Sequence, residues 1–532
     1  MQPDQRKEWE RRRTFGIISH PDAGKTTMTE KLLYLGGAIQ MAGTVKARKS
    51  GAYATSDWME LERARGISVT TSVMKFPYGD YEVNLLDTPG HNDFSEDTYR
   101  TLTAVDAALM MIDSAKGVET QTIKLMEVCR LRKTPIVTFI NKLDRDGLEP
   151  FDLLDNLEKV LGLDAVPLTW PLGMGKGFRG VYDLYRDRIQ LFDPSQEQGL
   201  GGFVDIAGLD DPALERILGK TATAALREEL DLVLGAGVRF DRDAFLEGRQ
   251  TPVFFGSALT GFGVAELLET FLEITPPPRG RTSVERYIDP TEPAFSGFIF
   301  KIQANMDPNH RDRIAFLRVC SGRFQRHQRL HHVRLQREMR ISTPIFFLAQ
   351  EREILEEAFP GDIVGLHDTG TLEIGDTLTE GEILHFTGIP SFAPEIFRRV
   401  RLDDPLKMKN LRKGLEQLAQ EGAVQLFRPV ETSELIVGVV GQLQLDVLQF
   451  RLQSEYSVRC HFEPIELTTA RWYRAEDPKV LATFEKAMAR SIARDVKERP
   501  VFLAESAWRL RHTTEKFPEI RFFATSEGVH GQ

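Results

Sequence analysis

The chain has 532 residues, of which 41% are hydrophobic and 27% are charged, a composition typical of folded globular proteins. This length allows roughly three or four domains of about 150 residues each. The formal net charge of −10 argues against a protein that coats nucleic acid non-specifically. A local basic surface would still be able to bind a polyanion.

No apolar run comes near the ~20 residues of a membrane-spanning helix, and the N-terminal residues lack the apolar core of a secretory signal. The three cysteines, Cys129, Cys320 and Cys460, lie far apart and do not have the spacing of a metal site. We therefore expect three buried thiols in a cytoplasmic protein that has no membrane contact.

The hydrophobic pattern divides the chain into three regions. Up to residue 275, apolar strand-like runs alternate with helical patterns, as in a doubly wound α/β domain. The run Thr-Pro-Pro-Pro-Arg-Gly at 275–280 breaks this pattern and predicts a stiff linker. From about 290 to 393, short strand-like runs separated by Gly, Pro and Asp indicate a small β-barrel.

The third region starts near residue 394. Met408, Leu411, Leu415 and Leu418 recur at spacings of three and four, which predicts a helix whose apolar stripe is core, with Gly422 at its C-cap. The remaining expected elements are strands at 423–427 and 435–440, a helix around 445–452 and a strand at 458–462. This order predicts a split βαβ, ferredoxin-like domain, which we expect 471–532 to complete. No internal repeat is visible.

Residues 19–26, Ser-His-Pro-Asp-Ala-Gly-Lys-Thr, follow an apolar run and approach the phosphate-loop pattern G-x-x-x-x-G-K-[ST]. Gly24 lets the backbone approach a phosphate, Lys25 supplies a positive charge, and the Thr26 hydroxyl suits Mg²⁺. The small Ser19 stands in for the usual first glycine, and Thr27 can reach the α-phosphate. The predicted phosphate-binding residues are Ser19, His20, Pro21, Asp22, Ala23, Gly24, Lys25, Thr26 and Thr27.

A second motif, Asp87-Thr88-Pro89-Gly90-His91, closes another apolar strand-like run. Asp87 is placed to hold Mg²⁺ through water, and the Gly90 N–H can bond the γ-phosphate. A lone histidine is usually structural, but His91 follows this loop directly, where it can orient the attacking water. We therefore predict His91 as the catalytic residue.

A third motif, Asn141-Lys142-Leu143-Asp144, closes the next strand-like run and predicts the loop that reads the base. A carboxylate at Asp144 can accept both the N1–H and the N2–H of guanine, whereas adenine offers no such pair of donors. Each such charge-assisted bond is worth roughly 1.5–3 kcal/mol. The Lys142 stem would lie across the base plane.

Ser257-Ala258-Leu259 follows a further apolar run and predicts the last guanine-contacting loop, where a backbone N–H would bond the base oxygen. The value of this tripeptide comes only from its order in the chain. Three ordered motifs, each at the end of a predicted strand, predict a GTP-hydrolysing switch domain that binds GTP or GDP with Mg²⁺.

These motifs together resemble translational GTPases such as elongation factors Tu and G. The stretch 57–68 resembles their first switch, with Ser68 where the family places a Mg²⁺-binding threonine. Thr70 and Thr71 are nearby hydroxyl alternatives. The resemblance implies three metal-binding residues, Thr26, Ser68 and Asp87, and a catalytic role for His91. Ile67 and Pro21 stand where the family has an apolar gate, and the proline departs from that pattern.

Within this family, the chain resembles bacterial GTP-dependent class II peptide-chain release factors. Asn141 and Ser257 are 116 positions apart, which leaves room for a large insertion, and 167–173 resembles a pattern of that group. The resemblance implies a ribosome-activated GTPase that expels class I release factors after peptide release. Its expected partners are the ribosome with its RNA and, functionally, class I release factors; we expect a monomer.

The resulting fold prediction is an α/β P-loop GTPase domain followed by a small β-barrel and an α+β ferredoxin-like domain. The expected boundaries are 1–280, with an insertion at about 150–250, then 281–393 and 394–532. The alternatives are another translational GTPase, acting in translocation or ribosome protection, or a regulatory GTPase subunit of a metabolic enzyme.

Two arginine-rich stretches are candidate RNA contacts. Residues 323–340 hold six arginines and three histidines against one glutamate. They would either bind ribosomal RNA or form a solvated strand face with acidic partners elsewhere in the chain. Around the helix predicted at 408–418, a second basic cluster is expected to be a solvated face: Arg398, Arg399, Arg401, Lys407, Lys409, Arg412 and Lys413.

Overall fold

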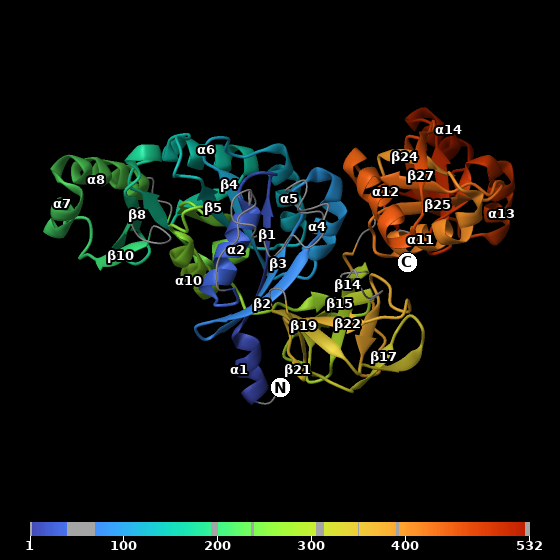
Figure 1. Cartoon of the computed structure of the whole chain (residues 1–532), viewed down its shortest axis with the longest axis horizontal. Coiled ribbons are helices and arrows are strands. Elements are labelled where there is room, and N and C mark those ends of the chain that lie inside the picture. Colours follow the sequence, from blue (N-terminus) through green and yellow to red (C-terminus); the bar gives the residue numbers. More distant parts are fainter. Residues whose placement is uncertain are drawn as a thin grey trace.

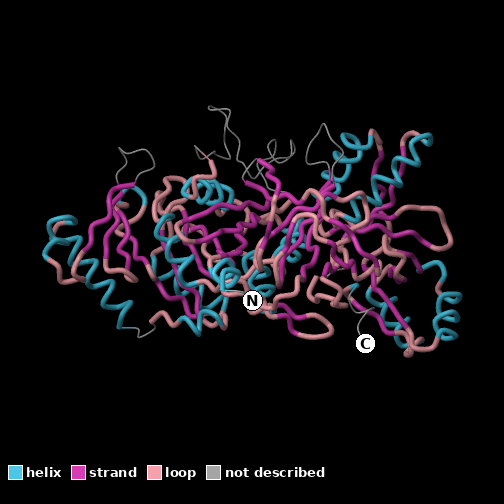
Figure 2. Tube along the Cα trace, turned by 90° about the horizontal axis from the view of Figure 1, so that it is seen from below, coloured by secondary structure: helices cyan, strands magenta, loops and turns pink. Residues whose placement is uncertain are grey.

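The computed structural model describes residues 3–39, 70–192, 200–235, 239–304, 313–348, 351–389 and 393–526. An α/β part built on the first half of the chain lies beside a curled antiparallel β part, and an α/β part built on the C-terminal residues lies beyond them (Figure 1). Seen from below, helices lie at both ends of the long axis, and strands together with further helices lie between them (Figure 2). The expected fold class is confirmed, whereas the boundaries at 280 and 393 stay predictions.

The first part is built on a seven-stranded sheet that is parallel except for β2. In spatial order its strands are β2 (Ser72–Tyr78), β3 (Tyr81–Asp87), β1 (Arg12–Ser19), β4 (Ala107–Asp113), β5 (Ile136–Asn141), β11 (Gln250–Phe255) and β6 (Asp164–Pro167). The central strands β1, β4, β5 and β11 are buried along their whole length. Near-continuous apolar runs are typical of parallel strands that are covered on both faces.

Helices cover this sheet, and a short N-terminal helix precedes it. They are α1 (Pro3–Glu10), α2 (Lys25–Leu35), α4 (Ser95–Thr101), α5 (Thr120–Leu131), α6 (Pro150–Leu161) and α10 (Val264–Ile274). Parallel strands run in the same direction, so the loops that follow β1, β3, β4, β5 and β11 emerge at one edge of the sheet. All three predicted nucleotide motifs lie at this edge.

Between β6 and β11 the chain builds a separate antiparallel sheet with its own helices. Its strands are β7 (Thr169–Pro171), β8 (Gly180–Asp183), β9 (Arg188–Phe192) and β10 (Leu200–Asp205), and the helices are α7 (Pro212–Leu218), α8 (Lys220–Gly235) and α9 (Arg242–Leu246). Trp170 is fully buried here and packs against Phe151 and Phe255. Helices α7 and α8 lie at the end of the molecule farthest from the C-terminal part (Figure 1).

The β part curls an eight-stranded antiparallel sheet around a core that includes Ile299, Leu317 and Val364. In spatial order the strands are β18 (Arg337–Arg340), β17 (Arg329–His332), β23 (Thr377–Thr379), β14 (Ser296–Ala304), β15 (Arg313–Ser321), β22 (Ile363–His367), β19 (Pro344–Leu348) and β20 (Glu351–Ile354). Two short pairs accompany it: β12 (Arg281–Thr282) with β13 (Tyr287–Ile288), and β16 (Phe324–Gln325) with β21 (Glu357–Ala358).

The C-terminal part contains two βαββαβ units. The first runs β24 (Ile396–Leu402), α11 (Met408–Gln420), β25 (Gln425–Pro429), β26 (Ile436–Val439), α12 (Gln442–Tyr456) and β27 (Cys460–Pro464). The second runs β28 (Thr469–Arg474), α13 (Pro478–Ala487), β29 (Ile492–Arg494), β30 (Pro500–Ala504), α14 (Ala507–Lys516) and β31 (Arg521–Phe523). Strands β25 and β29 pair antiparallel and join both units into one eight-stranded sheet. The sequence indicated only the first unit.

Most of the expected apolar stripe of α11 is core, because Leu411, Leu415 and Leu418 are buried. The expectation that Met408 belongs to the core is wrong, because this residue is 42% exposed at the first position of the helix. The three cysteines are buried, as expected, and have free thiols. None of the helices in the described parts of the chain has both the length and the apolarity that a membrane span requires.

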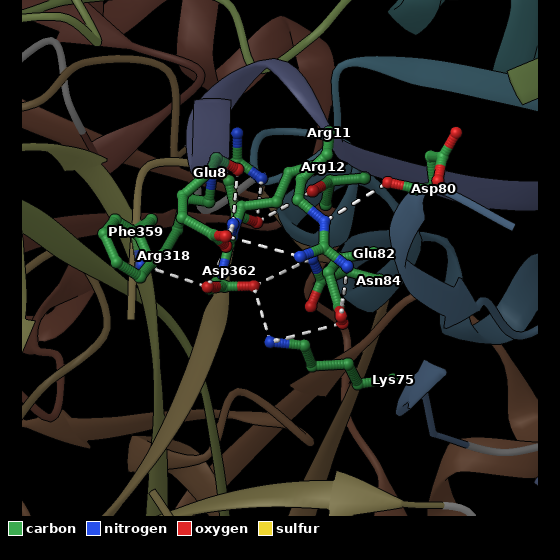
Figure 3. A network of polar contacts seen from close by, with 12 residues as sticks. Glu8, Arg11, Arg12, Lys75, Asp80, Glu82, Asn84, Arg318, Phe359 and Asp362 are labelled. Carbon is green, nitrogen blue, oxygen red and sulfur yellow. Dashed lines mark hydrogen bonds and ion pairs between the residues drawn. The ribbon is translucent and has the colours of Figure 1, made fainter. Parts of the chain in front are cut away.

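A buried ion cluster around Asp362 joins the β part to the first part (Figure 3). Its carboxylate accepts hydrogen bonds from Arg12 Nε at 2.8 Å, Lys75 Nζ at 3.0 Å and Asn84 Nδ2 at 3.2 Å, as well as from the Phe359 N–H. Burial alone would raise the pKa of Asp362, but the charges of Arg12 and Lys75 outweigh it and hold this pKa well below its usual range. The ionised carboxylate is therefore a counter-charge for the buried Arg12, which also pairs with Glu8, and for the partly buried Lys75.

We expect Asp362→Ala to destabilise the protein by about 3–5 kcal/mol, because Arg12 and Lys75 would lose their buried counter-charge. The comparison is Asp155→Ala, which removes an ion pair between two exposed side chains, Asp155 and Lys159, and should cost less than about 1 kcal/mol. Urea denaturation followed by circular dichroism measures both. Equal midpoints for the two variants would contradict the role given to Asp362.

Candidate nucleotide-binding site

The predicted phosphate loop connects β1 to α2. Ser19 ends the strand, Lys25 begins the helix, and Gly24 is the N-cap in a left-handed conformation with φ +99°. Asp22 is also left-handed, with φ +65°. The N–H groups at the start of α2 and the positive end of the helix dipole make this turn suitable for an anion. His20 lies 3.4 Å from Glu119 at the edge of the loop.

Asn141 at the end of β5 braces two of the predicted loops. Its Nδ2 donates to the Ala23 carbonyl at 2.8 Å, and its Oδ1 accepts from the Ala258 N–H at 2.8 Å. A Cβ on Gly24 would lie 2.2 Å from Asn141 Nδ2, so only glycine fits beneath this amide. Both polar atoms of the Asn141 amide therefore fix the backbone around the site.

Lys25 and Asp87 form an ion pair between the phosphate loop and the end of β3. Both side chains are buried, and Asp87 Oδ2 has no hydrogen-bond partner within the described residues. A buried carboxylate oxygen without a partner, together with the hydroxyl of Thr26, which follows Lys25 in the chain, is a donor set suited to Mg²⁺. Ser68, the third predicted metal ligand, lies outside the described residues, as does the rest of the stretch 57–68.

The loop after Asp87 lies against the phosphate loop. Thr88 Oγ1 donates to the Ile17 carbonyl at 2.6 Å and ties the loop to β1. An ideal Cβ on Gly90 would lie 3.6 Å from Pro21 Cα, so these two backbones are in contact. His91 follows, and its side chain is 38% exposed.

The other predicted base-reading residues come together in the loops that follow β5 and β11. Ser257 Oγ donates to Asp144 Oδ1 at 2.6 Å, and the Leu143 N–H donates to the Gly256 carbonyl at 3.1 Å. Lys142 has φ +74°, and its ammonium contacts the Asp22 carbonyl and Asp113 Oδ2. The predicted loops are thus brought together at one edge of the sheet; the exposed Leu259 lies at their rim.

Sequence reasoning missed Asp113, which ends β4 between the two predicted loops. Its Oδ2 lies 2.7 Å from Lys142 Nζ, and its Oδ1 accepts from the Ala115 N–H at 2.9 Å. Burial alone would raise the pKa of Asp113, but bonds to Lys142 and Ala115 hold it below its ordinary value. The signal was available, because Asp113 directly follows the apolar run 107–112 just as Asp87 follows its own run.

Asp97 and Lys301, which the sequence also did not indicate, form a group with Thr71 where the described chain resumes after residue 69. Thr71 Oγ1 donates to Asp97 Oδ2 at 2.7 Å, and Lys301 from β14 bonds both the Thr71 carbonyl and Asp97. Burial alone would raise the pKa of Asp97, but Lys301 and Arg100 hold it below its usual value. The Thr71 hydroxyl, an alternative metal ligand by sequence, is therefore already engaged in the protein.

The arginines of 323–340 have mostly acidic partners. Arg326 pairs with Glu356 at 2.7 Å, Arg334 with Asp376 at 2.6 Å, and Arg329 lies 3.8 Å from Glu338. Arg323 pairs with Glu357. These contacts favour the solvated strand face with acidic partners over an RNA-binding surface.

The basic cluster near α11 contains both arginines paired with glutamates and exposed cationic side chains. Arg399 and Arg401 pair with glutamates, Arg399 with Glu434 at 3.0 Å and Arg401 with Glu463 at 2.7 Å. Lys409, Arg412 and Lys413 are exposed. A solvated face, as expected from the sequence, accounts for this arrangement.

Comparison with known proteins identifies the family. Residues 10–277 match the model of the elongation factor Tu GTP binding domain, which covers half of the chain. The chain belongs to the translational GTPases. Residues 294–381 match elongation factor G domain 2, and residues 386–514 match the C-terminal domain of class II release factor RF3. This translational GTPase therefore hydrolyses GTP and carries a class II release factor domain.

A crystal structure of a protein from Thermus thermophilus is also similar to this GTPase. The TM-score is 0.68 at 26% sequence identity, and the match covers 87% of this chain and 68% of that chain. The similarity therefore extends well beyond the nucleotide-binding sheet.

We expect Gly24→Ala to weaken GTP binding by at least about tenfold, because the residue combines a left-handed φ with a Cβ position 2.2 Å from Asn141 Nδ2. The control is Gly177→Ala, where φ is not left-handed and nothing lies within 4 Å of the new methyl group. Titration with a fluorescent GTP analogue measures both affinities. Unchanged affinity in Gly24→Ala would place the phosphates elsewhere.

Proposed function

We propose that this translational GTPase promotes the dissociation of class I release factors from the ribosome after peptide release, and that GTP hydrolysis then frees the GTPase itself. The observation that carries the proposal is the match of residues 386–514 to a class II release factor domain. It accompanies a nucleotide site of the translational GTPase type. The partners are the ribosome, including its RNA, and class I release factors; the protein acts as a monomer.

The phosphate end of the site is assigned to the loop between β1 and α2. The backbone N–H groups of residues 19–27 cradle the phosphates, with Thr27 at the α-phosphate, and Lys25 faces the β- and γ-phosphates. Thr26, Ser68 and Asp87 would hold Mg²⁺, which would supply positive charge to offset that of the phosphates. Asp87 supports this assignment because one of its buried oxygens lacks a protein partner among the described residues.

The base end is assigned to the loops after β5 and β11. Asp144 accepts the two guanine N–H groups, the Lys142 stem covers the base, and a backbone N–H of residues 257–259 bonds the base oxygen. Asn141 holds these loops against the phosphate loop through the two hydrogen bonds of its side-chain amide. A wrong base would leave the Asp144 carboxylate unpaired, which is how a polar site rejects it.

Hydrolysis is assigned to the loop of Gly90 and His91. The Gly90 N–H bonds the γ-phosphate, and His91 orients the attacking water. Loss of the γ-phosphate breaks the Gly90 bond and releases the loop, which couples the nucleotide to conformation. Ribosomal RNA docked beside His91 completes the site, as other switch GTPases use a group supplied in trans.

We expect His91→Ala to bind GTP with nearly unchanged affinity but to lose ribosome-stimulated turnover by a factor of about 10²–10⁴, because the water is no longer oriented. Single-turnover hydrolysis of radiolabelled GTP with and without ribosomes measures this effect. Turnover at the wild-type rate would remove His91 from the catalytic role.

The recycling role is tested by following a fluorescently labelled class I release factor on post-termination ribosomes. We expect this protein with GTP to accelerate its dissociation, and the same protein with GDP to accelerate it much less. Ribosome-stimulated hydrolysis without accelerated dissociation would instead favour translocation or ribosome protection. Absence of ribosome stimulation would favour a metabolic regulatory subunit.

A further inference from the structure

Helix α12 has no side chain at its N-cap position, although a residue of its own first turn bonds the N–H of that position. Its N-cap residue is Gly441, which has no side chain, and its first turn contains no acidic residue. Gln444 Oε1 accepts from the Val440 N–H at 2.7 Å and from the Gly441 N–H at 3.4 Å, so it serves the residues that precede the first turn. The N–H of Leu443, which an N-cap side chain would ordinarily bond, needs another acceptor.

Asp93 of the GTPase part supplies that cap. Asp93 Oδ2 accepts from the Leu443 N–H at 2.7 Å, so the carboxylate stands where the side chain of an N-cap residue would stand. A Cβ on Gly441 would lie only 2.0 Å from Asp93 Cγ. Gly441 has an extended backbone, φ −142°, so its conformation does not require glycine. The close approach of Asp93 is what excludes a larger residue.

Other contacts hold the same two surfaces together. Phe94, which follows Asp93, packs against Val447 and Leu443 of α12. Further along, Arg100 Nη2 donates to the Gly422 carbonyl at 3.1 Å, and Gln425 Nε2 donates to Glu96 at 3.3 Å. The C-terminal part is therefore docked along residues 93–100, immediately after the predicted catalytic histidine.

Asp93 also contacts His91 directly. The Asp93 N–H donates to His91 Nδ1 at 3.2 Å, and Asp93 Oδ1 lies 3.2 Å from the same nitrogen. When neutral His91 accepts at Nδ1, its proton sits on Nε2; when His91 is charged, Nδ1–H faces the carboxylate and Nε2 again carries a proton. The N–H of residue 93 favours the neutral tautomer with its proton on Nε2, whereas the carboxylate favours a proton on Nδ1, and both contacts hold the direction of the imidazole ring.

We propose that Asp93 is a positioning residue for His91, and that the N-terminus of α12 holds Asp93 in place. The orientation of His91 then depends on the docking of the C-terminal part, because one carboxylate serves both contacts. This inference rests on the catalytic role assigned to His91 under the proposed function. It adds a route by which a movement of the C-terminal part changes the rate of GTP hydrolysis.

The test compares Asp93→Ala, Gly441→Ala and the double variant, with Gly177→Ala as the matched control. Each single variant should lower the ribosome-stimulated kcat about 10- to 100-fold, the usual cost of a misplaced catalytic group. GTP affinity and the ribosome concentration that gives half-maximal stimulation should stay within about twofold of wild type. The double variant should be no slower than Asp93→Ala, because the new methyl group at 441 then meets no carboxylate.

Wild-type kcat in Asp93→Ala or in Gly441→Ala would overturn the inference, and so would multiplicative losses in the double variant. Nitrogen-15 NMR of His91 provides a readout that a purely structural role of Asp93 would not move. Gly441→Ala should change the nitrogen-15 shifts of His91, because displacing the Asp93 carboxylate alters the contact at Nδ1. Shifts identical to those of wild type would count against the coupling.

His91→Ala separates this inference from the function on which it rests. If His91→Ala abolishes turnover while Asp93→Ala does not, the positioning role fails and the catalytic assignment stands. If His91→Ala turns over normally, the catalytic assignment itself has failed.

Discussion

The buried carboxylate of Asp362 is the interaction on which the arrangement of the first two parts depends. It brings together cations from the two strands β1 and β2, Arg12 and Lys75, and an amide from β3. Breaking one partner of such a buried cluster leaves uncompensated charge, which is why these contacts act together. The strands that end in the nucleotide loops are thereby fixed to the β part (Figure 3).

A second group of contacts extends this frame. Arg318 of β15 pairs with Asp106 at 2.6 Å and donates to the Gly361 carbonyl, while Arg281 also reaches Asp106 at 3.0 Å. Lys301 of β14 holds Asp97. The β part is therefore tied both to the start of β4 and to the helix that follows His91. The C-terminal part docks through residues 93–100, so the loop proposed to sense the γ-phosphate lies close in the chain to the residues that contact α12.

The meeting of the predicted nucleotide loops at one edge of the sheet could be expected from the sequence, because the motifs are local. Residues 19–26, 87–91 and 141–144 each follow a buried strand, and parallel strands place their following loops at one edge. The bracing role of Asn141 was not visible, since Ala23 and Ala258 meet it only through tertiary folding.

The features that the sequence could not predict depend on short elements or on distant partners. The second βαββαβ unit contains strands of only three residues, β29 and β31, too short for an alternating pattern to be recognised. Met408 continued a helical stripe but lies at the helix start, where packing ends. Distant partners are equally invisible: Glu356 lies 30 residues from Arg326, and Leu443 lies 350 residues from its cap, Asp93.

If the loop of Gly90 and His91 senses the γ-phosphate as proposed, the nucleotide state should reach the C-terminal part through Asp93. Dyes attached at Glu247→Cys and Arg490→Cys, two exposed positions, would report the separation of the two parts, because the three native cysteines are buried. We expect different energy transfer with a non-hydrolysable GTP analogue than with GDP, and a smaller difference in Gly441→Ala. Identical transfer with both nucleotides would show that the nucleotide does not move the C-terminal part.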